Sequence, residues 1–391
     1  MECSLYIHIP FCTKKCDYCD FFSRETSNGV PENYIKSLKN EISFYAEKYK
    51  VSRWKTIYIG GGTPSLLSEN NLKFILDFLE PQKSNELTLE VNPESLTKEK
   101  LLIAKNAGVS RLSVGIQSLN DSALQAVSRN CSQSQILSAL NLIKSTWNNA
   151  LNLDIIAGLP CQSKEEAISS LKKIVLYRPQ HISLYTLTVE EETPLAKKIK
   201  GGFEFDYDKA DEEWLLGRDI LLKNGYTQYE VSNFCLSGFE SVHNMTYWTQ
   251  ESYIGVGSGA SGTIYDFPNA LRWTNTFDIN YWTNFWQKPH NKIEDFGLLR
   301  KEEKLSLKDL EFEFLMLGLR TICGVDAEKY KNRFSALAPW NGNLEARLKC
   351  CDWESLCREK KALRQTRCGT TNYSLTKEGL LFLNAILLKL L

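Results

Sequence analysis

Three cysteines near the N-terminus have the spacing of a metal-binding loop. Cys12, Cys16 and Cys19 form a C-x3-C-x2-C run directly after a short apolar segment, residues 5–9. Thiolates are soft ligands that suit zinc or an iron–sulfur cluster. A structural zinc site needs four protein ligands, usually in two pairs, and no second pair lies near this run. Three thiolates leave one iron of a 4Fe–4S cluster open to a small molecule, so the pattern favours a cluster.

The composition supports this interpretation of the cysteines. The chain has 12 cysteines in 391 residues, far fewer than a disulfide-stapled secreted scaffold. Its N-terminal residues lack the basic region of a signal peptide, and no apolar run approaches the ~20 residues of a membrane span. We therefore expect a cytoplasmic protein with reduced thiols and no transmembrane segment. The 47 Lys and Arg residues balance the 47 Asp and Glu residues, which gives no general electrostatic reason to bind nucleic acid.

The elements that must position these cysteines follow a repeating pattern. Stretches with helical spacing and plausible N-caps separate six apolar runs of strand length. Such an alternation predicts right-handed βαβ units and a parallel sheet, two units short of an eight-fold barrel. An open doubly wound sheet is the alternative. The six runs are residues 5–9, 56–59, 86–91, 111–116, 151–156 and 181–187.

The pattern loosens after Pro194. We expect a helix over residues 206–224 and a strand near 226–231, whereas residues 265–300 have no clear period and suggest a connection. Helical spacing resumes at Ser306, which predicts a second, mainly helical domain. The predicted division is a first domain of residues 1–265, a connecting segment of residues 266–300 and a C-terminal domain of residues 301–391.

Polar and glycine residues interrupt the apolar strands near their carboxyl ends. The run Gly60-Gly61-Gly62-Thr63-Pro64 follows the second strand, and Glu90, Gln117 and Asp154 lie late in or just after the next three. Ligands of parallel α/β folds bind at this end of the strands. Glycines without a Cβ also let the backbone come close to a ligand. These residues are therefore candidates for binding a small molecule.

A second glycine-rich stretch, residues 257–262, matches G-x-G-x-x-G. A dinucleotide site would also need a following helix within a βαβ unit and an acidic residue about 20 positions later. Pro268 and the irregular residues beyond it argue against that context. Close packing is a sufficient reason for these glycines.

The N-terminal segment Tyr6-Ile-His-Ile-Pro-Phe-Cys12-x3-Cys16-x-Tyr18-Cys19 resembles the radical S-adenosylmethionine (SAM) superfamily, and within it the oxygen-independent coproporphyrinogen III oxidase family. The resemblance implies a partial (β/α)6 TIM-like barrel with a small, winged-helix-like C-terminal domain. It also implies a 4Fe–4S cluster whose open iron binds SAM. Such a cofactor supplies radical chemistry, while the protein positions it. The SAM contacts that the resemblance implies are Tyr6, Tyr18, Gly61, Gly62, Thr63, Glu90, Gln117, Arg129 and Asp154.

A second motif, His243-Asn-Met-Thr-Tyr-Trp248, suggests a heme contact. Neutral imidazole is a common axial ligand of heme iron, and aromatic rings pack on porphyrins. A structural role for His243 is the alternative from the residues alone, and Cys235 is a second candidate for the axial ligand. The motif is similar to an H-N-x-x-Y-W sequence of the heme-chaperone subgroup in the same family. We therefore take His243 as the heme candidate.

One position separates the subgroups that the resemblance brings together. The oxidases of this family carry a fourth cysteine two residues after the third, and here that position is Phe21. This departure favours a heme chaperone that delivers heme to other proteins, with respiratory membrane enzymes as implied recipients and transient membrane association through them. The alternatives are a coproporphyrinogen III oxidase, which decarboxylates porphyrinogen propionates, and a zinc-binding module.

Overall fold

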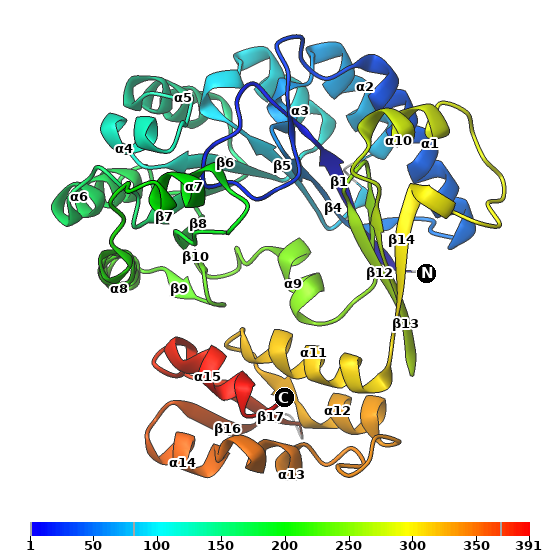
Figure 1. Ribbon diagram of the computed structural model, residues 1–391, viewed down its shortest axis with the longest axis vertical. Coiled ribbons are helices and arrows are strands. Elements are labelled where there is room, and N and C mark those ends of the chain that lie inside the picture. The colour runs from blue at the N-terminus through cyan, green and yellow to red at the C-terminus, as the bar shows by residue number, and fades with distance from the viewer. Residues whose placement is uncertain (1, 81–82, 368–369) are drawn as a thin grey trace.

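A large sheet dominates this computed structural model, which describes residues 2–80, 83–367 and 370–391 (Figure 1). Within that range the sheet has twelve strands in the order β14-β13-β12-β11-β1-β4-β5-β6-β7-β8-β10-β9. Its central part is parallel and follows the chain from β1 to β8. The central strands are β1 (Cys3–Ile9), β4 (Trp54–Gly61), β5 (Glu86–Val91), β6 (Arg111–Gln117), β7 (Ala150–Ala157) and β8 (His181–Thr186).

Helices cover the outer face of this curved parallel sheet (Figure 1). In the described strands β1 pairs with β11 and β8 pairs with β10, so β1 and β8 do not close on each other. The structure therefore confirms the predicted partial barrel, and its six strands lie where the apolar runs predicted them. The helices are α1 (Glu32–Lys48), α2 (Glu69–Leu79), α3 (Lys98–Ala107), α4 (Asp121–Ala126), α5 (Gln133–Thr146), α6 (Lys164–Val175), α7 (Pro194–Lys200) and α8 (Tyr207–Lys223).

Each central strand alternates between two kinds of residue. In β5 the apolar Leu87, Leu89 and Val91 belong to the main hydrophobic core, whereas Thr88 and Glu90 line a cavity on the other face. Because side chains alternate across a strand, one face packs against the helices and the other faces the barrel interior. The neighbouring strands repeat the pattern, so the interior of the barrel is polar.

The segment 266–300 corrects one prediction. We expected an irregular connection, but it contains β13 (Asn269–Asn275), which pairs with β12 (Ser261–Asp266), and the helix α10 (Ile279–Trp286), which packs against α1. Trp282 and Trp286 of this helix are fully buried in the same core as the parallel strands. The expectation failed because these elements are short, and a strand and a helix within 18 residues leave no extended period. The boundaries of the predicted domains stay a prediction.

The glycine-rich residues 257–262 connect β11 (Tyr253–Val256) to the antiparallel strand β12. A helix does not follow them, and a Cβ added to Gly257 would lie 2.5 Å from the backbone oxygen of His8. Gly257 also has φ +100°, which L-residues rarely adopt. Close packing thus accounts for this stretch, as the sequence indicated. The strand predicted near residues 226–231 is short: β9 (Thr227–Gln228) pairs with β10 (Asn233–Cys235).

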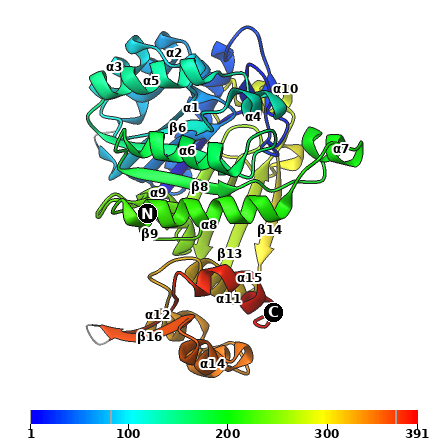
Figure 2. The ribbon, with the colours of Figure 1, turned by 90° about the vertical axis from the view of Figure 1, so that its left-hand side faces the viewer.

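The helix α9 (Val242–Trp248) lies between the barrel and the C-terminal region (Figure 1). The C-terminal region packs around its own hydrophobic cluster, which includes Phe314, Tyr330 and Phe334. Figure 2 shows it beneath α8, with α11 and α15 nearest the barrel. Its elements are β14 (Arg300–Leu305), which reaches down from the main sheet, α11 (Leu307–Leu319), β15 (Val325–Asp326), α12 (Ala327–Phe334), α13 (Leu344–Leu348), α14 (Trp353–Arg358), β16 (Ala362–Arg367), β17 (Thr370–Leu375) and α15 (Leu383–Leu388).

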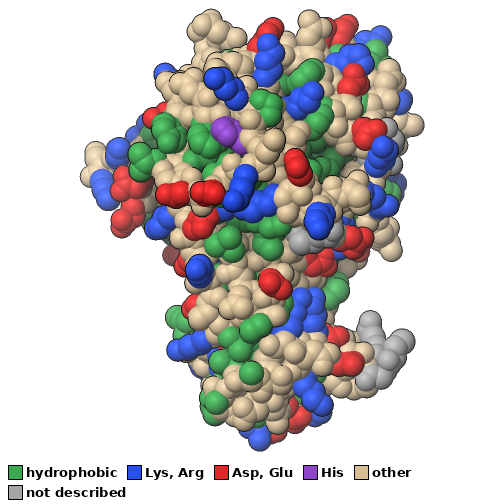
Figure 3. All heavy atoms as spheres, turned by 90° about the vertical axis from the view of Figure 1, so that its right-hand side faces the viewer, with side chains coloured by type: hydrophobic (Ala, Val, Ile, Leu, Met, Phe, Trp, Pro, Cys, Tyr) green, Lys and Arg blue, Asp and Glu red, His purple; other side chains and the backbone are tan. Residues whose placement is uncertain are grey.

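The C-terminal region is mainly helical, as predicted, with a small sheet of order β15-β17-β16 in its described residues. Its winged-helix-like character stays a prediction. None of the described helices combines the length and the apolar character that crossing a bilayer requires. On the face drawn in Figure 3, Lys and Arg side chains stand among Asp and Glu side chains, in keeping with zero net charge.

Candidate functional site

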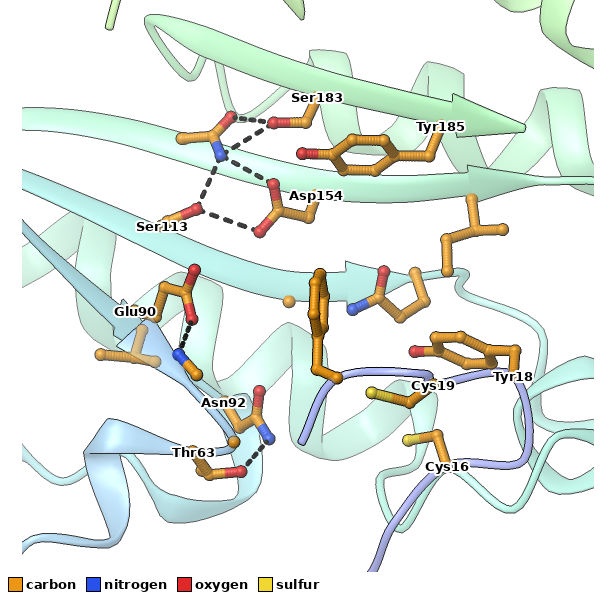
Figure 4. A pocket seen from close by; sticks show the side chains of 18 of the residues that line it. Cys16, Tyr18, Cys19, Thr63, Glu90, Asn92, Ser113, Asp154, Ser183 and Tyr185 are labelled. Atoms are coloured by element: carbon orange, nitrogen blue, oxygen red, sulfur yellow. Dashed lines mark hydrogen bonds between the residues drawn. The ribbon is translucent and has the colours of Figure 1, made fainter. Parts of the chain in front are cut away.

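A cavity of about 480 Å³ runs through the interior of the barrel. This volume lies within the range of about 300–1,000 Å³ of small-molecule sites. Its walls are the polar faces of the strands, and the cysteine loop lies at one end (Figure 4). Of the residues expected at a SAM and cluster site, the cavity brings together Cys12, Cys16, Tyr18, Cys19, Gly61, Gly62, Thr63, Glu90, Gln117, Arg129 and Asp154.

The three cysteines lie on the loop that follows β1. Cys12 ends the two-residue strand β2 (Phe11–Cys12), which pairs with β3 (Arg24–Glu25). Its sulfur accepts a hydrogen bond from the Thr63 hydroxyl at 3.5 Å, while the Cys16 sulfur accepts one from Arg129 Nη1 at 3.9 Å. Three thiols, two of them with side-chain donors beside the sulfur, suit a cluster held by three cysteines. In the described residues no three candidate side chains have metal-ligand spacing, so this ligand set stays a prediction.

Asp17 fastens the cysteine loop to the rest of the barrel. Its carboxylate accepts hydrogen bonds from the Ser128 hydroxyl at 2.8 Å and from Lys198 Nζ at 2.5 Å. Its backbone N–H donates to the Val127 oxygen, and its backbone oxygen accepts from the Leu195 N–H. These bonds join the loop to α7 and to the turn after α4. The thiols are therefore held at the cavity by contacts that do not involve sulfur.

The glycine turn after β4 brings its backbone against the cysteine loop. A Cβ added to Gly62 would lie 2.6 Å from the Phe11 oxygen and 2.9 Å from the Cys12 sulfur. One added to Gly61 would lie 2.6 Å from Nδ1 of His8, and Gly61 has φ +120°. Only glycine tolerates such contacts and such a φ. The turn therefore needs these residues for a close approach, as the sequence indicated.

Two partly buried carboxyl groups face the cavity from β5 and β7 (Figure 4). Glu90 accepts hydrogen bonds from the Tyr58 hydroxyl at 2.6 Å and from the Gly61 N–H at 3.0 Å. Burial raises the pKa of Glu90 to about 7, because desolvation outweighs these two bonds. Burial also raises the pKa of Asp154, which accepts from Ser113 and Asn152 at 3.0 and 2.8 Å. Both groups can accept hydrogen bonds from a bound ligand.

Gln117 and Arg129 have unusual local settings. Gln117 ends β6 with φ +65°, where the pairing with β7 shifts register. Such a conformation is costly for a residue with a side chain and clusters at functional sites. Arg129 is buried, and its Nη2 donates to the Gly115 oxygen at 2.9 Å and lies 3.9 Å from a Glu94 oxygen. The guanidinium is thus held between β6 and the cysteine loop.

Two predicted site residues do not line the cavity. Tyr6 lies on the same face of the sheet as its register partner Tyr58, which does line the cavity, and its hydroxyl hydrogen-bonds Nδ1 of His8 at 2.9 Å. His243 is fully buried at 0% exposure, and its two ring nitrogens hydrogen-bond Thr56 and Tyr247, each at 2.8 Å. In this arrangement the imidazole has no nitrogen free for iron. Burial also lowers the pKa of His243 to about 3, so the ring is neutral.

The sequence analysis missed the deeper part of the cavity. Polar residues line it along the strands, all but Tyr185 well before the carboxyl ends, and the N-terminal part of α9 with its cap adds two more. The signal for the strand residues was present, because each occupies an alternate position in an apolar run. These residues are Thr88, Arg111, Ser113, Asn152, His181, Ser183, Tyr185, Ser241 and Asn244.

Comparison with known proteins agrees with this geometry. A model of the Radical SAM superfamily matches residues 6–174. Heme chaperone HemW of Lactococcus lactis is 35% identical over 338 residues, 85% of each chain. Heme chaperone HemW of Escherichia coli is 32% identical over 403 residues, which cover 98% of this chain and 97% of that one. The mitochondrial radical S-adenosyl methionine domain-containing protein 1 of Mus musculus is 34% identical over 86% of this chain and 77% of its own.

Among solved structures, coproporphyrinogen III oxidase (HemN) of Escherichia coli superposes with a TM-score of 0.80. The alignment covers 100% of this chain and 90% of that one, at 20% sequence identity. At that identity the likeness establishes the fold alone. It extends beyond the barrel to the C-terminal region.

Replacing any one of Cys12, Cys16 or Cys19 by Ser should remove most of the bound iron and the visible absorbance of the cluster. Hydroxyl oxygen is a poor ligand for such a cluster, and three thiolates are the smallest set that holds it. Iron and sulfide analysis of anaerobically reconstituted protein measures this. Cys350→Ser, at an exposed position, is the control and should retain both. Unchanged iron in Cys16→Ser would contradict the assignment.

The affinity for SAM should rise between pH 6 and pH 8. Glu90, with a pKa near 7, is protonated below that pH and ionised above it, and the ionised form is the stronger acceptor. Glu90→Gln should weaken SAM binding at pH 8 by about tenfold and flatten the pH dependence. Calorimetry on cluster-loaded protein tests this. Glu191→Gln, at an exposed carboxylate outside the cavity, should behave like the wild type; an unchanged pH profile in Glu90→Gln would place the titrating group elsewhere.

Proposed function

This chain belongs to the heme chaperone HemW family of radical SAM proteins, and from that membership we propose that it binds heme and delivers it to heme-requiring proteins. The observation that carries the proposal is the extent of the similarity. Identity of 32–35% to curated heme chaperones spans 84–98% of the chain, so it includes more than the cofactor-binding barrel. A radical SAM barrel alone would leave the activity open, because one fold supports many functions.

As a radical SAM protein the chain binds a 4Fe–4S cluster and SAM. We infer that Cys12, Cys16 and Cys19 hold the cluster. The donors beside the sulfurs and the glycine turn against Cys12 support this assignment. The methionine part of SAM then lies at Gly61, Gly62 and Thr63, and the rest of the ligand contacts Tyr18, Glu90, Gln117, Arg129 and Asp154. Tyr6 adjoins this wall beside Tyr58 and hydrogen-bonds His8, and its contact with SAM stays a prediction.

Phe21 argues against the coproporphyrinogen oxidase alternative. It occupies the position at which the oxidases carry their fourth cysteine, and its side chain is 65% exposed at the mouth of the cavity. The likeness to the oxidase structure is one of fold at 20% identity. The zinc module is also disfavoured, because Cys3, the cysteine next to the loop in sequence, is buried in β1 and its sulfur bonds to the backbone of Ser4 and Ser252.

The recipients follow from the resemblance rather than from a surface of this chain. We infer that they are respiratory membrane enzymes and that the protein contacts the membrane transiently, through them. We infer a cytoplasmic location, which suits this role.

We retain His243 as the proposed axial ligand of heme, on the condition that one of the two hydrogen bonds of its ring is broken first. A neutral imidazole is the form that binds iron. The ring must first release Tyr247 from Nε2 or Thr56 from Nδ1. Cys235 is the weaker candidate, because burial raises the pKa of its thiol to about 12 and the side chain is fully buried. A thiolate there would be costly.

Anaerobic incubation with coproporphyrinogen III, SAM and reductant tests the function, with a heme titration of the same preparation alongside. We expect saturable heme binding, seen as a shifted Soret band, and no decarboxylated porphyrinogen. Coproporphyrinogen oxidase assayed in parallel is the positive control. Repeated turnover of coproporphyrinogen III to a decarboxylated product would favour the oxidase over the heme chaperone.

Two substitutions on α9 separate an axial role of His243 from a structural one. If Nε2 binds iron, Tyr247→Phe removes its competitor and should strengthen heme binding by about threefold to tenfold. His243→Ala should weaken heme binding and shift the Soret band. Neither should change cluster iron or SAM affinity, because the proposed sites share no residue. Wild-type heme binding in His243→Ala, together with a changed spectrum in Cys235→Ser, would assign the iron to the cysteine.

A further inference from the structure

We propose that the deep end of the barrel cavity is a subsite for a carboxylate of the tetrapyrrole, bound by Arg111 and Thr88. This subsite lies at the amino-terminal ends of the strands, opposite to the cysteine loop. The identification of the ligand as a tetrapyrrole rests on the proposed heme function, whereas the unpaired donors are observed in the structure. A carboxylate here would anchor the propionate edge of the tetrapyrrole inside the barrel.

Two buried polar atoms at this end have no hydrogen-bond partner among the described residues. They are Nη1 of Arg111 and the hydroxyl oxygen of Thr88. Both side chains line the cavity, and Thr88 and Arg111 are direct partners in the register of β5 and β6. A buried donor left unpaired destabilises the folded protein, and most buried polar groups of proteins are paired. Because the two side chains are neighbours and both line the cavity, one ligand group can bond to both.

The remaining bonds of Arg111 fix the direction of Nη1. Its Nε donates to Glu86 at 3.0 Å, and its Nη2 donates to the backbone oxygens of Phe239 and Glu240 at 2.9 and 3.2 Å. The guanidinium is planar, so these three bonds leave Nη1 as the one free corner. A ligand oxygen at that corner would meet a donor that loses little further freedom on binding.

The subsite is distinct from the SAM end of the cavity. Arg111 begins β6 and Gln117 ends it, and six residue steps along a strand span roughly 20 Å. The residues expected to hold SAM cluster at the Gln117 end, beside the cysteines and the glycine turn. The carboxylate of a SAM molecule bound there does not reach Arg111, so the ligand group at the deep end comes from a second molecule.

A carboxylate fits these donors better than a neutral group. Arginine binds carboxylates through charge-assisted bonds that are about twice as strong as neutral ones, and the Thr88 hydroxyl adds a second donor. Ser241, which caps α9, and Asn244 of α9 also line the cavity. Heme, the proposed cargo, carries two propionate carboxylates. Either of them can accept the hydrogen bonds that Arg111 and Thr88 have free to donate.

The test compares iron protoporphyrin IX with its dimethyl ester, in which both carboxylates are blocked. Each is titrated into wild-type protein and into Thr88→Val, an almost isosteric change that removes the free hydroxyl. We expect the wild type to prefer the diacid by about tenfold or more. Thr88→Val should weaken diacid binding by about tenfold and leave the diester unchanged. Arg111→Lys, which keeps a cation beside Glu86 but loses the free corner, should reduce the preference in the same direction.

The melting temperature of the ligand-free protein provides a second test that does not depend on heme affinity. Because the Thr88 hydroxyl has no partner, Thr88→Val should raise the melting temperature of ligand-free protein by about 1–3 °C. Thr56→Val is the matched control, since the Thr56 hydroxyl on the adjacent strand bonds Ser4 and His243 at 2.8 Å each. That variant should be less stable than the wild type. Equal losses of stability in the two variants would overturn the proposal.

The outcomes separate this proposal from the function on which it rests. Equal affinity of the wild type for the diacid and the diester, with heme still bound, overturns the subsite and leaves the chaperone function standing. The same result follows if Thr88→Val weakens both ligands alike. A wild-type protein that binds neither ligand overturns both proposals. SAM affinity serves as the control for the other end of the cavity and should be the same in all variants; a loss of SAM binding in Thr88→Val would assign the donors to SAM and overturn the subsite.

Discussion

The alternation of polar and apolar residues along the six parallel strands is the constraint from which the rest of the structure follows. One set of side chains, such as Leu87, Leu89 and Val91, packs under the helices and holds the sheet together. The other set faces inward and is too polar to pack into a dry core. An inward face of this kind remains stable only when its groups bond one another, as Ser113, Asn152 and Asp154 do, or bond a ligand. The barrel is therefore built around a cavity with polar walls.

The two ends of that cavity are built in different ways. At the carboxyl ends of the strands, glycines without side chains let the turn at Gly61 and Gly62 approach the cysteine loop. At the amino ends, the buried ion pair of Glu86 and Arg111 closes the barrel. Glu86 also accepts bonds from the backbone of Val242 and His243, which seats α9 across the opening. Breaking such a pair leaves a buried charge and costs several kcal/mol, so the pair stabilises the closed end.

The open end could be predicted from the sequence, and the closed end could not. The cysteine run, the glycines and Glu90 carry their meaning in residue type and local spacing, and helix starts such as Ser132 and Ser163 follow from local capping. Arg111 and Thr88 look ordinary in sequence, because their role depends on the register between two strands. Tertiary packing also determines the structure of residues 266–300. This segment has no clear hydrophobic periodicity, but the burial of Trp282 and Trp286 in the main core stabilises a helix there. For His243 the sequence and the structure point to different roles. Its motif suggests a ligand of heme iron, whereas its hydrogen bonds to Thr56 and Tyr247 hold α9 against the barrel.

The contacts of α9 make it a wall shared by the two halves of the molecule. On its barrel side His243 bonds Thr56. On its other side the Arg320 guanidinium lies over the Trp248 ring, 4.6 Å from its centre. Gln250, just beyond the helix, donates a hydrogen bond to the Leu310 oxygen of α11 at 2.9 Å. A shift of the C-terminal region would therefore move the floor of the cavity without touching the cluster.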